Sequence, residues 1–293
     1  MFEFKGKIAF VTGGASGIGF AVAQALADEG CKVAIADIDE GRLAAAKDEF
    51  RGDALTVRLN VADAESWAAA RKTVEAKLGP TDILIQCAGV MDTPGAPMVK
   101  RGIVDYSKER WDRMISISLT GIGYGLMEFG PGIRDRGCGY IVNTASTQGI
   151  IPTRGVACYS ASKFGVVGLT EALQQELKDD NIGVSVLIPG VVKTRLAFNE
   201  LKRIGVKAPF EIMPIGMEAE EVGRIVIDGM KKSKLHIITH GEYRKACEDR
   251  MQELLRDFDD VAISADYDPS KPLAGTKEWA QATADAEKAK LNQ

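Results

Sequence analysis

Histidine is the rarest residue of this 293-residue chain, which contains only His236 and His240. The two lie four positions apart near an expected strand, and nothing near them in the sequence completes a set of metal ligands. The sequence therefore predicts no metal site.

Paired cysteines are missing as well. The five cysteines are odd in number and scattered without paired spacing, at positions 31, 87, 138, 158 and 247. This usage argues against the disulfide framework of a small secreted domain and predicts reduced thiols in a cytosol.

Neither sign of charge dominates, and long apolar runs are lacking. The 37 Lys and Arg residues against 41 Asp and Glu give a net charge of −4, with no basic cluster for nucleic acid. No apolar run approaches the length of a membrane span. The first residues include Glu3 and Lys5 in place of the apolar core of a signal peptide. We expect a cytoplasmic protein with neither a nucleic-acid nor a membrane partner.

The composition that remains is that of a globular protein with a large core. Hydrophobic residues make up 45% and charged residues 27% of the chain. At this length the chain fits one large α/β domain, or one domain with an extension.

A glycine-rich stretch near the N-terminus predicts a phosphate cradle. An apolar strand from Ile8 to Val11 is followed by the glycine-rich turn Thr12–Gly19 and then by an Ala-rich helix from Phe20 to Ala27. Glycines let the backbone turn sharply and approach a ligand closely, and the free N–H groups of the helix start attract a pyrophosphate.

Asp37 directly follows the next expected strand, 32–36, and lies about twenty residues after the glycine loop. A carboxylate at this place accepts hydrogen bonds from ribose hydroxyls and repels a ribose phosphate, which favours NAD(H) over NADP(H). Ile38 is apolar and Ser16 is neutral, so we expect no cation placed to accept that phosphate. The alternative is an ordinary exposed acid at a strand end.

Tyr159 and Lys163 form a second candidate site. Their i, i+4 spacing places the phenol and the ammonium on one helix face. A free tyrosine has a pKa of about 10; lowering that pKa by about three units, with help from a positively charged cofactor ring, corresponds to roughly 4 kcal/mol. Tyr159 would then act as general acid and base, while Ser146, at the end of the expected strand 139–145, would hydrogen-bond the substrate oxygen.

These motifs, in this order, resemble the short-chain dehydrogenase/reductase family over roughly residues 5–240. The resemblance implies an α/β fold with a doubly wound, Rossmann-like parallel sheet in a single domain, 1–240. Residues 241–293 continue beyond the point where members of the family often end, and their own pattern predicts a C-terminal helix and extended arm. The resemblance also implies an NAD cofactor, a small-molecule substrate and a homodimer or homotetramer. The implied cofactor-binding residues are Gly13, Ser16, Gly17, Ile18, Gly19, Asp37, Ile38, Asn60, Val61, Cys87, Ala88, Gly89, Tyr159, Lys163, Pro189, Gly190, Val192 and Thr194.

The chain departs from the family pattern at several of these places. Asn60 stands where the family usually has Asp, and Gln86 and Cys87 stand where it typically has two Asn. Cys87 is either a reactive thiol or a small packing residue. Ser118, in an expected long helix 107–129, replaces the Asn that holds a water for proton relay, and we include it among the candidate catalytic residues Ser118, Ser146, Tyr159 and Lys163.

Two segments are expected to form the substrate site, the loop 90–106 and the apolar segment 195–214. Their apolar content points to a bulky hydrophobic substrate, although the same residues suit ordinary packing. The strand Ile-Ile-Thr-His followed by a long helix resembles a subgroup that acts on bulky, often aromatic secondary alcohols, including bacterial Cα-dehydrogenases.

We therefore predict an NAD(H)-dependent oxidoreductase that interconverts a secondary alcohol and a ketone. One alternative is a non-catalytic nucleotide-binding protein on the same fold, suggested by Ser118, Gln86 and Cys87. Another is an epimerase or dehydratase of the extended branch, which usually carries TGxxGxxG.

Overall fold

The computed structural model describes residues 2–91, 102–194, 216–264, 267–268, 270–276, 278–279, 281–283 and 285. The chain divides into two compact units, Met1–Arg244 and Lys245–Gln293. The expected substrate-covering segment 195–214 and most of the loop 90–106 lie outside the described residues. Within the described ranges, every helix is too short or too polar to cross a membrane.

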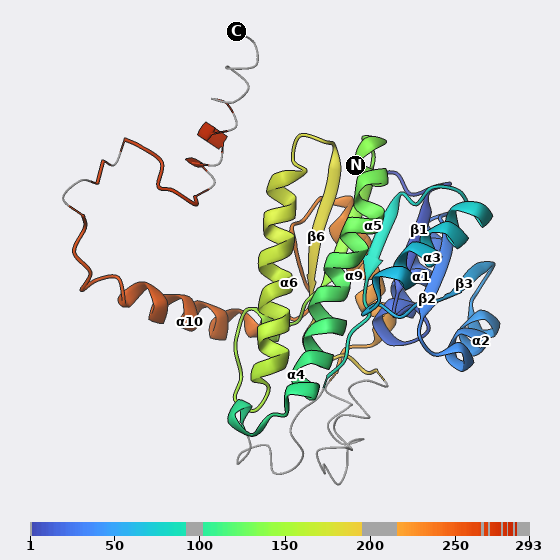
Figure 1. Cartoon of the computed structure of the whole chain (residues 1–293), viewed down its shortest axis with the longest axis horizontal. Coiled ribbons are helices and arrows are strands. Elements are labelled where there is room, and N and C mark those ends of the chain that lie inside the picture. Colours follow the sequence, from blue (N-terminus) through green and yellow to red (C-terminus); the bar gives the residue numbers. More distant parts are fainter. Residues whose placement is uncertain are drawn as a thin grey trace. The chain divides into compact units, whose positions relative to one another are not determined.

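The first unit is built on a seven-stranded parallel sheet (Figure 1). The strand order is β3-β2-β1-β4-β5-β6-β7, the doubly wound arrangement expected from the sequence. The strands are β1 Ile8–Thr12, β2 Lys32–Asp37, β3 Ala54–Arg58, β4 Ile83–Gln86, β5 Gly139–Thr144, β6 Ile182–Ile188 and β7 His236–Ile238. The four central strands β1, β4, β5 and β6 are almost entirely buried, which explains their continuous apolar runs.

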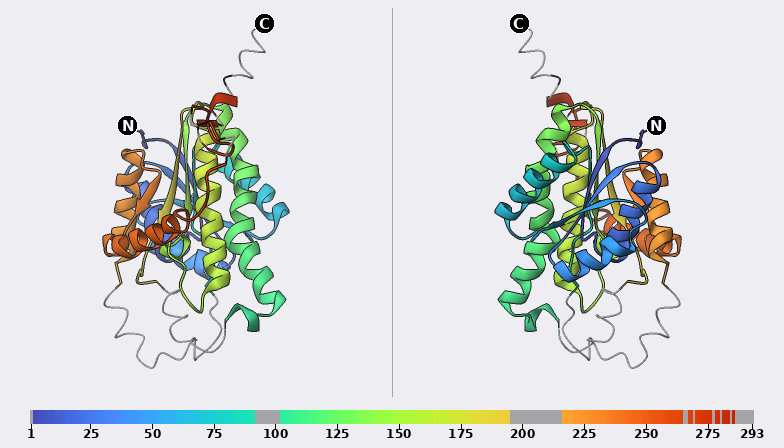
Figure 2. Two further views of the ribbon diagram at one scale, coloured as in Figure 1. Left: turned by 90° about the vertical axis from the view of Figure 1, so that its left-hand side faces the viewer. Right: turned by 90° about the vertical axis from the view of Figure 1, so that its right-hand side faces the viewer.

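Helices cover both faces of the sheet. The helices are α1 Gly17–Asp28, α2 Glu40–Glu49, α3 Ala64–Lys77, α4 Lys108–Ile115, α5 Gly121–Asp135, α6 Ala157–Glu176 and α9 Ala219–Lys231. One core cluster joins the sheet to α1, α2 and α9, and two others join it to α3, α5 and α6. In both views of Figure 2 the orange α9 and the green α5 accordingly lie on opposite sides.

The long helix expected over 107–129 is interrupted, which corrects that prediction. A π-helical turn, Ser116–Thr120, separates α4 from α5, and α5 continues to Asp135. Such turns insert an extra residue into a helix and often mark functional sites. Ser118 lies inside this turn and is fully buried.

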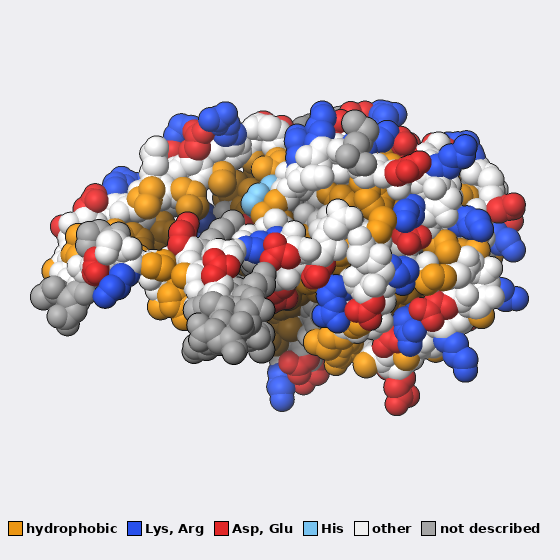
Figure 3. Space-filling model, turned by 90° about the horizontal axis from the view of Figure 1, so that it is seen from above, with side chains coloured by type: hydrophobic (Ala, Val, Ile, Leu, Met, Phe, Trp, Pro, Cys, Tyr) orange, Lys and Arg blue, Asp and Glu red, His pale blue; other side chains and the backbone are white. Residues whose placement is uncertain are grey.

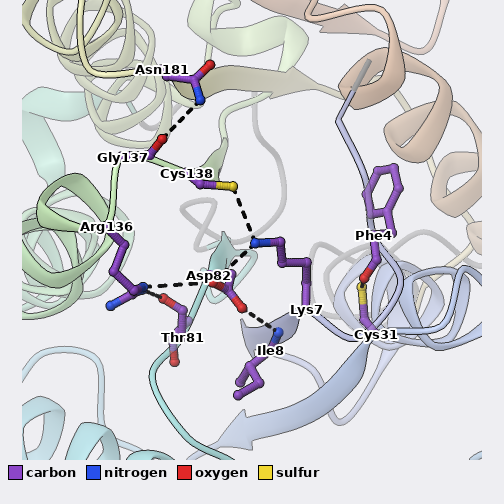
Figure 4. A network of polar contacts seen from close by, with 10 residues as sticks. All are labelled: Phe4, Lys7, Ile8, Cys31, Thr81, Asp82, Arg136, Gly137, Cys138 and Asn181. Carbon is purple, nitrogen blue, oxygen red and sulfur yellow. Dashed lines mark hydrogen bonds and ion pairs between the residues drawn. The ribbon is translucent and has the colours of Figure 1, made fainter.

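Charged side chains close the end of the sheet where the strands begin (Figure 4). The Asp82 carboxylate accepts the Ile8 backbone N–H at 2.9 Å and lies 3.7 Å from the Lys7 ammonium and 3.8 Å from the Arg136 guanidinium. Lys7 also donates to the Cys138 sulfur at 3.3 Å. Figure 3 looks down on this end, where acidic and basic side chains are interspersed.

The second unit begins within α10, Arg244–Arg256, whose first residue is the last of the first unit and which follows a 3-10 turn, Gly241–Tyr243. The sequence led us to expect one helix over 241–258 there. The five cysteines all lie within the described residues, and none of them forms a disulfide.

Candidate active site

The glycine loop is closed tightly against the end of β4. Gly13 adopts a φ of +62°, and a Cβ atom there would lie 2.8 Å from the Ala88 nitrogen. A Cβ on Gly19 would lie 2.3 Å from the Gly13 oxygen. A side chain is therefore excluded at Gly13 and at Gly19, and α1 presents its N-terminus at Gly17 to the space above the loop.

A cavity of about 640 Å³ opens above this loop at the carboxyl ends of the strands. Most of the residues expected to bind the cofactor line it: Gly13, Ser16, Gly17, Ile18, Gly19, Asp37, Ile38, Asn60, Val61, Cys87, Ala88, Gly89 and Thr194. The loop geometry and the elongated set of lining residues, from β3 to the end of β4, fit a dinucleotide whose pyrophosphate lies on α1.

The end of the cavity near β2 contains a cation that the sequence analysis did not anticipate. Arg42, from the first turn of α2, lines the cavity together with Asp37 and Ile38. Its guanidinium donates to the Ser16 hydroxyl at 3.4 Å and pairs with Asp39 at 3.2 Å. The expectation that no cation lies here is thus wrong, because α2 brings Arg42 back onto the glycine loop across 26 positions.

Gln86 and Cys87, the two residues at the end of β4 that differ from the family pattern, both contact side chains of neighbouring elements. The Gln86 amide donates to the Asn143 side chain at 2.9 Å and to the Ile122 carbonyl at 3.1 Å, which ties β4 to β5 and α5. The Cys87 sulfur lies 3.2 Å from the Thr144 hydroxyl, and burial raises the pKa of its thiol to about 11. A thiol with this raised pKa stays protonated at neutral pH, which favours a packing role for Cys87 over that of a reactive thiol.

Ser146, Tyr159 and Lys163 converge where β5 ends and α6 begins. The Tyr159 phenol is hydrogen-bonded to the Ser146 side chain. The Lys163 ammonium donates to the Thr144 carbonyl at 2.9 Å and lies 5.7 Å from the centroid of the Tyr159 ring. Lys163 also approaches the cavity, because a Cβ on Gly89 would lie 3.6 Å from its Nζ atom.

Burial is the largest influence on the pKa values of Tyr159 and Lys163. It raises the pKa of Tyr159, partly opposed by the hydrogen bond from Ser146. It lowers the pKa of Lys163 to about 8, partly opposed by Cys87. For Tyr159, removal from water disfavours the phenolate more than these side chains favour it, whereas the lowering expected from the sequence also included the positive charge of a cofactor ring.

Ser118, the expected relay residue, is held by the backbone after β4. Its hydroxyl accepts the Val90 N–H at 3.3 Å, and its Oγ atom lies 3.9 Å from the Cβ position of Gly89. The π-helical turn thus brings Ser118 to the same glycine that Lys163 approaches.

The segment after β6 contacts both the strand end that carries Ser146 and the glycine loop. The Thr147 N–H donates to the Pro189 carbonyl at 2.9 Å, and the Thr194 methyl would lie 2.9 Å from a Cβ on Gly17. Of the expected cofactor residues, Tyr159, Lys163, Pro189, Gly190 and Val192 do not line the cavity itself.

Several residues at the site escaped the sequence analysis. Among them are Arg42, Leu59, Arg113 and Ile117, which line the cavity, and His240, described below. Val90 and Met91, which also line it, belong to the loop 90–106 that the sequence assigned to the substrate site. A usable signal existed for one of them: Asp39 caps α2, which places Arg42 in its first turn beside the end of β2.

Comparison with known proteins agrees with this geometry. A family model described as short chain dehydrogenase matches residues 7–204. The chain belongs to the short-chain dehydrogenase family. The family and the fold predicted from the sequence are thereby confirmed, and a short-chain dehydrogenase is an oxidoreductase.

Three relatives illustrate the range of this family. The trans-4-hydroxycyclohexanecarboxylate dehydrogenase of Sinomonas cyclohexanicum is 36% identical over 223 residues, covering 73% of this chain and 81% of the relative. A short-chain dehydrogenase structure from Novosphingobium aromaticivorans has a TM-score of 0.81 and 31% identity, covering 98% of this chain and 99% of that one. A short-chain dehydrogenase from Burkholderia phymatum, solved in complex with NAD, has a TM-score of 0.78 and 26% identity, covering 94% and 100%.

Proposed function

We propose that the protein is an NAD(H)-dependent dehydrogenase that interconverts a secondary alcohol and a ketone, with Tyr159 as general acid and base. The observation that carries this proposal is the convergence of three side chains beside the cavity. Tyr159 is hydrogen-bonded to Ser146, and the Lys163 ammonium lies 5.7 Å from its ring.

Tyr159 and Ser146 share the work at the substrate oxygen. Because burial raises the pKa of Tyr159, its phenol holds its proton at neutral pH and is ready to donate it to a carbonyl oxygen. In the oxidative direction the phenol first loses its proton to solvent, and the resulting phenolate, stabilised by the charge of Lys163, takes the proton of the alcohol. The Ser146 hydroxyl donates to the same substrate oxygen while its charge changes.

The residues of the cavity suit NAD as the hydride carrier. When bound, the nicotinamide supplies the hydride acceptor or donor and, in its oxidised form, a positive charge near the phenol. Gly13, Gly17 and Gly19 would hold the pyrophosphate at the N-terminus of α1, and Asp37 would accept hydrogen bonds from the ribose hydroxyls. The NAD complex of the Burkholderia relative supports this choice.

We further propose a bulky, ring-containing alcohol as the substrate. The Sinomonas relative is named for a hydroxyl on a cyclohexane ring, which is a secondary alcohol. The apolar side chains that the sequence places in 195–214 would suit the ring of such a substrate.

Absorbance at the NADH band tests the proposal directly. The purified protein should reduce NAD with at least one member of a panel of cyclic and aryl secondary alcohols, and oxidise NADH with the matching ketone. A protein that is stabilised against heat by NAD but turns over no member of the panel would instead be a nucleotide-binding protein.

A further inference from the structure

His240 occupies a place that the proposed chemistry does not explain. It lies two residues after the end of β7, the strand that pairs with β6, and Ile188 is the register partner of Ile238. Gly190 lies two residues beyond Ile188, and His240 lies two residues beyond Ile238. The parallel register therefore places His240 beside Gly190. The side chain is buried, with 6% exposed.

Both ring nitrogens of His240 bind the turn that follows β6. The Gly190 N–H donates to Nδ1 at 3.1 Å, and Nε2 lies 3.0 Å from the Val191 carbonyl oxygen. The Thr239 hydroxyl oxygen lies 2.5 Å from the same Nδ1 atom. Because a backbone N–H can only donate, Nδ1 carries no proton and the ring proton resides on Nε2, which donates to Val191.

The ring also excludes any other side chain from the turn. A Cβ on Gly190 would lie 2.8 Å from His240 Cγ. The glycine and the histidine thus form a matched pair, in which the missing side chain makes room for the imidazole.

The turn 189–194, held in this way, runs between the strand end that carries Ser146 and the glycine loop. On one side Pro189 accepts the N–H of Thr147, the neighbour of Ser146. On the other, the segment continues to Thr194, which packs on Gly17 of the phosphate loop. A dinucleotide with its adenosine at Asp37 would extend its other half across β1 and β4 toward this turn.

We propose that His240 is a positioning residue that holds the turn 189–194 in the conformation that binds the nicotinamide half of the dinucleotide. The inference rests on the proposed function, since it assumes a dinucleotide in the cavity. His240 touches neither cofactor nor substrate; it acts through Gly190 and Val191.

Titrations with NAD and with ADP-ribose, which lacks the nicotinamide, test this role. His240→Phe removes both hydrogen bonds and should weaken NAD binding by about tenfold. Its affinity for ADP-ribose should stay within about twofold of wild type. An unspecific structural defect would weaken both ligands together.

Two conservative variants and one control complete the experiment. His240→Asn retains an acceptor for Gly190, and His240→Gln retains a donor for Val191, so each should keep part of the NAD affinity that His240→Phe loses. His236, on the same strand, is exposed and lies 2.8 Å from Glu171, so His236→Asn should leave both affinities unchanged. If His240→Phe does not fold, the Asn and Gln variants carry the same comparison.

Equal losses for NAD and ADP-ribose in the His240 variants, or no loss for NAD, would overturn the inference while leaving the dehydrogenase proposal intact. A wild-type protein that binds neither NAD nor ADP-ribose would instead remove the proposed function and this inference with it.

Discussion

The two ends of the sheet are built from the same seven strands but are finished in different ways. Where the strands begin, Asp82 accepts a backbone N–H from Ile8 and pairs with Lys7 and Arg136 (Figure 4). Where the strands end, glycines and small residues border a cavity of about 640 Å³. One end satisfies its backbone groups with its own side chains, and the other keeps backbone N–H groups available to a ligand.

This difference separates stability from chemistry along a single sheet. Substitutions where the strands begin should change the free energy of unfolding and spare the reaction. Substitutions where they end should change the reaction or the ligand preference at a smaller cost in stability.

The largest effect is expected for Tyr159→Phe, which removes the proton donor and keeps the ring. We expect kcat/KM to fall about a thousandfold, or about 4 kcal/mol in the activation barrier, with NAD affinity unchanged. Steady-state kinetics and NAD titration measure both. Tyr124→Phe on α5 is the matched control and should keep wild-type kinetics; near-normal turnover by Tyr159→Phe would contradict the assignment.

At the opposite end, Asp82→Ala should lower the free energy of unfolding by about 3 kcal/mol. The change leaves the Ile8 N–H without its acceptor and Lys7 and Arg136 without their shared partner. Urea denaturation measures the loss, and kcat/KM of the folded protein should stay within about twofold. Asp48→Ala, at an exposed position of α2, should change neither quantity. A large loss of kcat/KM in folded Asp82→Ala would break the proposed separation.

Asp37→Ser tests which charge decides between NAD and NADP. Arg42 already lies at the ribose end of the cavity, bound to Ser16 and Asp39. Removing the carboxylate should therefore raise the NADP-to-NAD affinity ratio about a hundredfold, or about 2.7 kcal/mol.

The double variant Asp37→Ser/Arg42→Ala is the control for that experiment. It should lose most of the gain in NADP affinity, because the remaining cavity offers the ribose phosphate no guanidinium there. Equal NADP affinity in the single and double variants would show that Arg42 does not reach the phosphate.

The smallest expected effect concerns the buried ammonium of Lys163. Its pKa is lowered to about 8 in the folded protein, from 10.5 for an unburied lysine. Between these values the unfolded chain binds more protons, so this group makes the protein more stable as the pH rises. Relative to Lys163→Met, wild type should gain about 2 kcal/mol between pH 7 and 9.5, measured by urea denaturation of both proteins. A difference that is independent of pH would contradict the lowered pKa.

Local sequence signals were sufficient for most elements of the first unit. The expected strand 32–36 is β2, one residue longer, and Asp63, an ordinary capping residue, caps α3 by accepting the Glu65 N–H. These features depend on neighbours within about one helical turn or one strand, so the local sequence specifies them.

The interrupted helix shows where local reasoning failed. Nothing in the residues Ser116–Thr120 demands a π-helical turn, because ordinary helix hydrogen bonds would also suit them. The extra residue lies where Ser118 meets the Val90 N–H, a contact made by a different element 28 positions away.

By itself the sequence determined the order of the strands and helices, the glycine loop and the candidates for proton transfer, because periodicity and short motifs encode them locally. Only the tertiary structure decided which distant groups form hydrogen bonds. These are Arg42 with the Ser16 hydroxyl, His240 with the Gly190 N–H, and Asp82 with the Ile8 N–H, at separations of 26, 50 and 74 residues. Those contacts follow from strand order and register, which arise from packing the whole sheet between its two layers of helices.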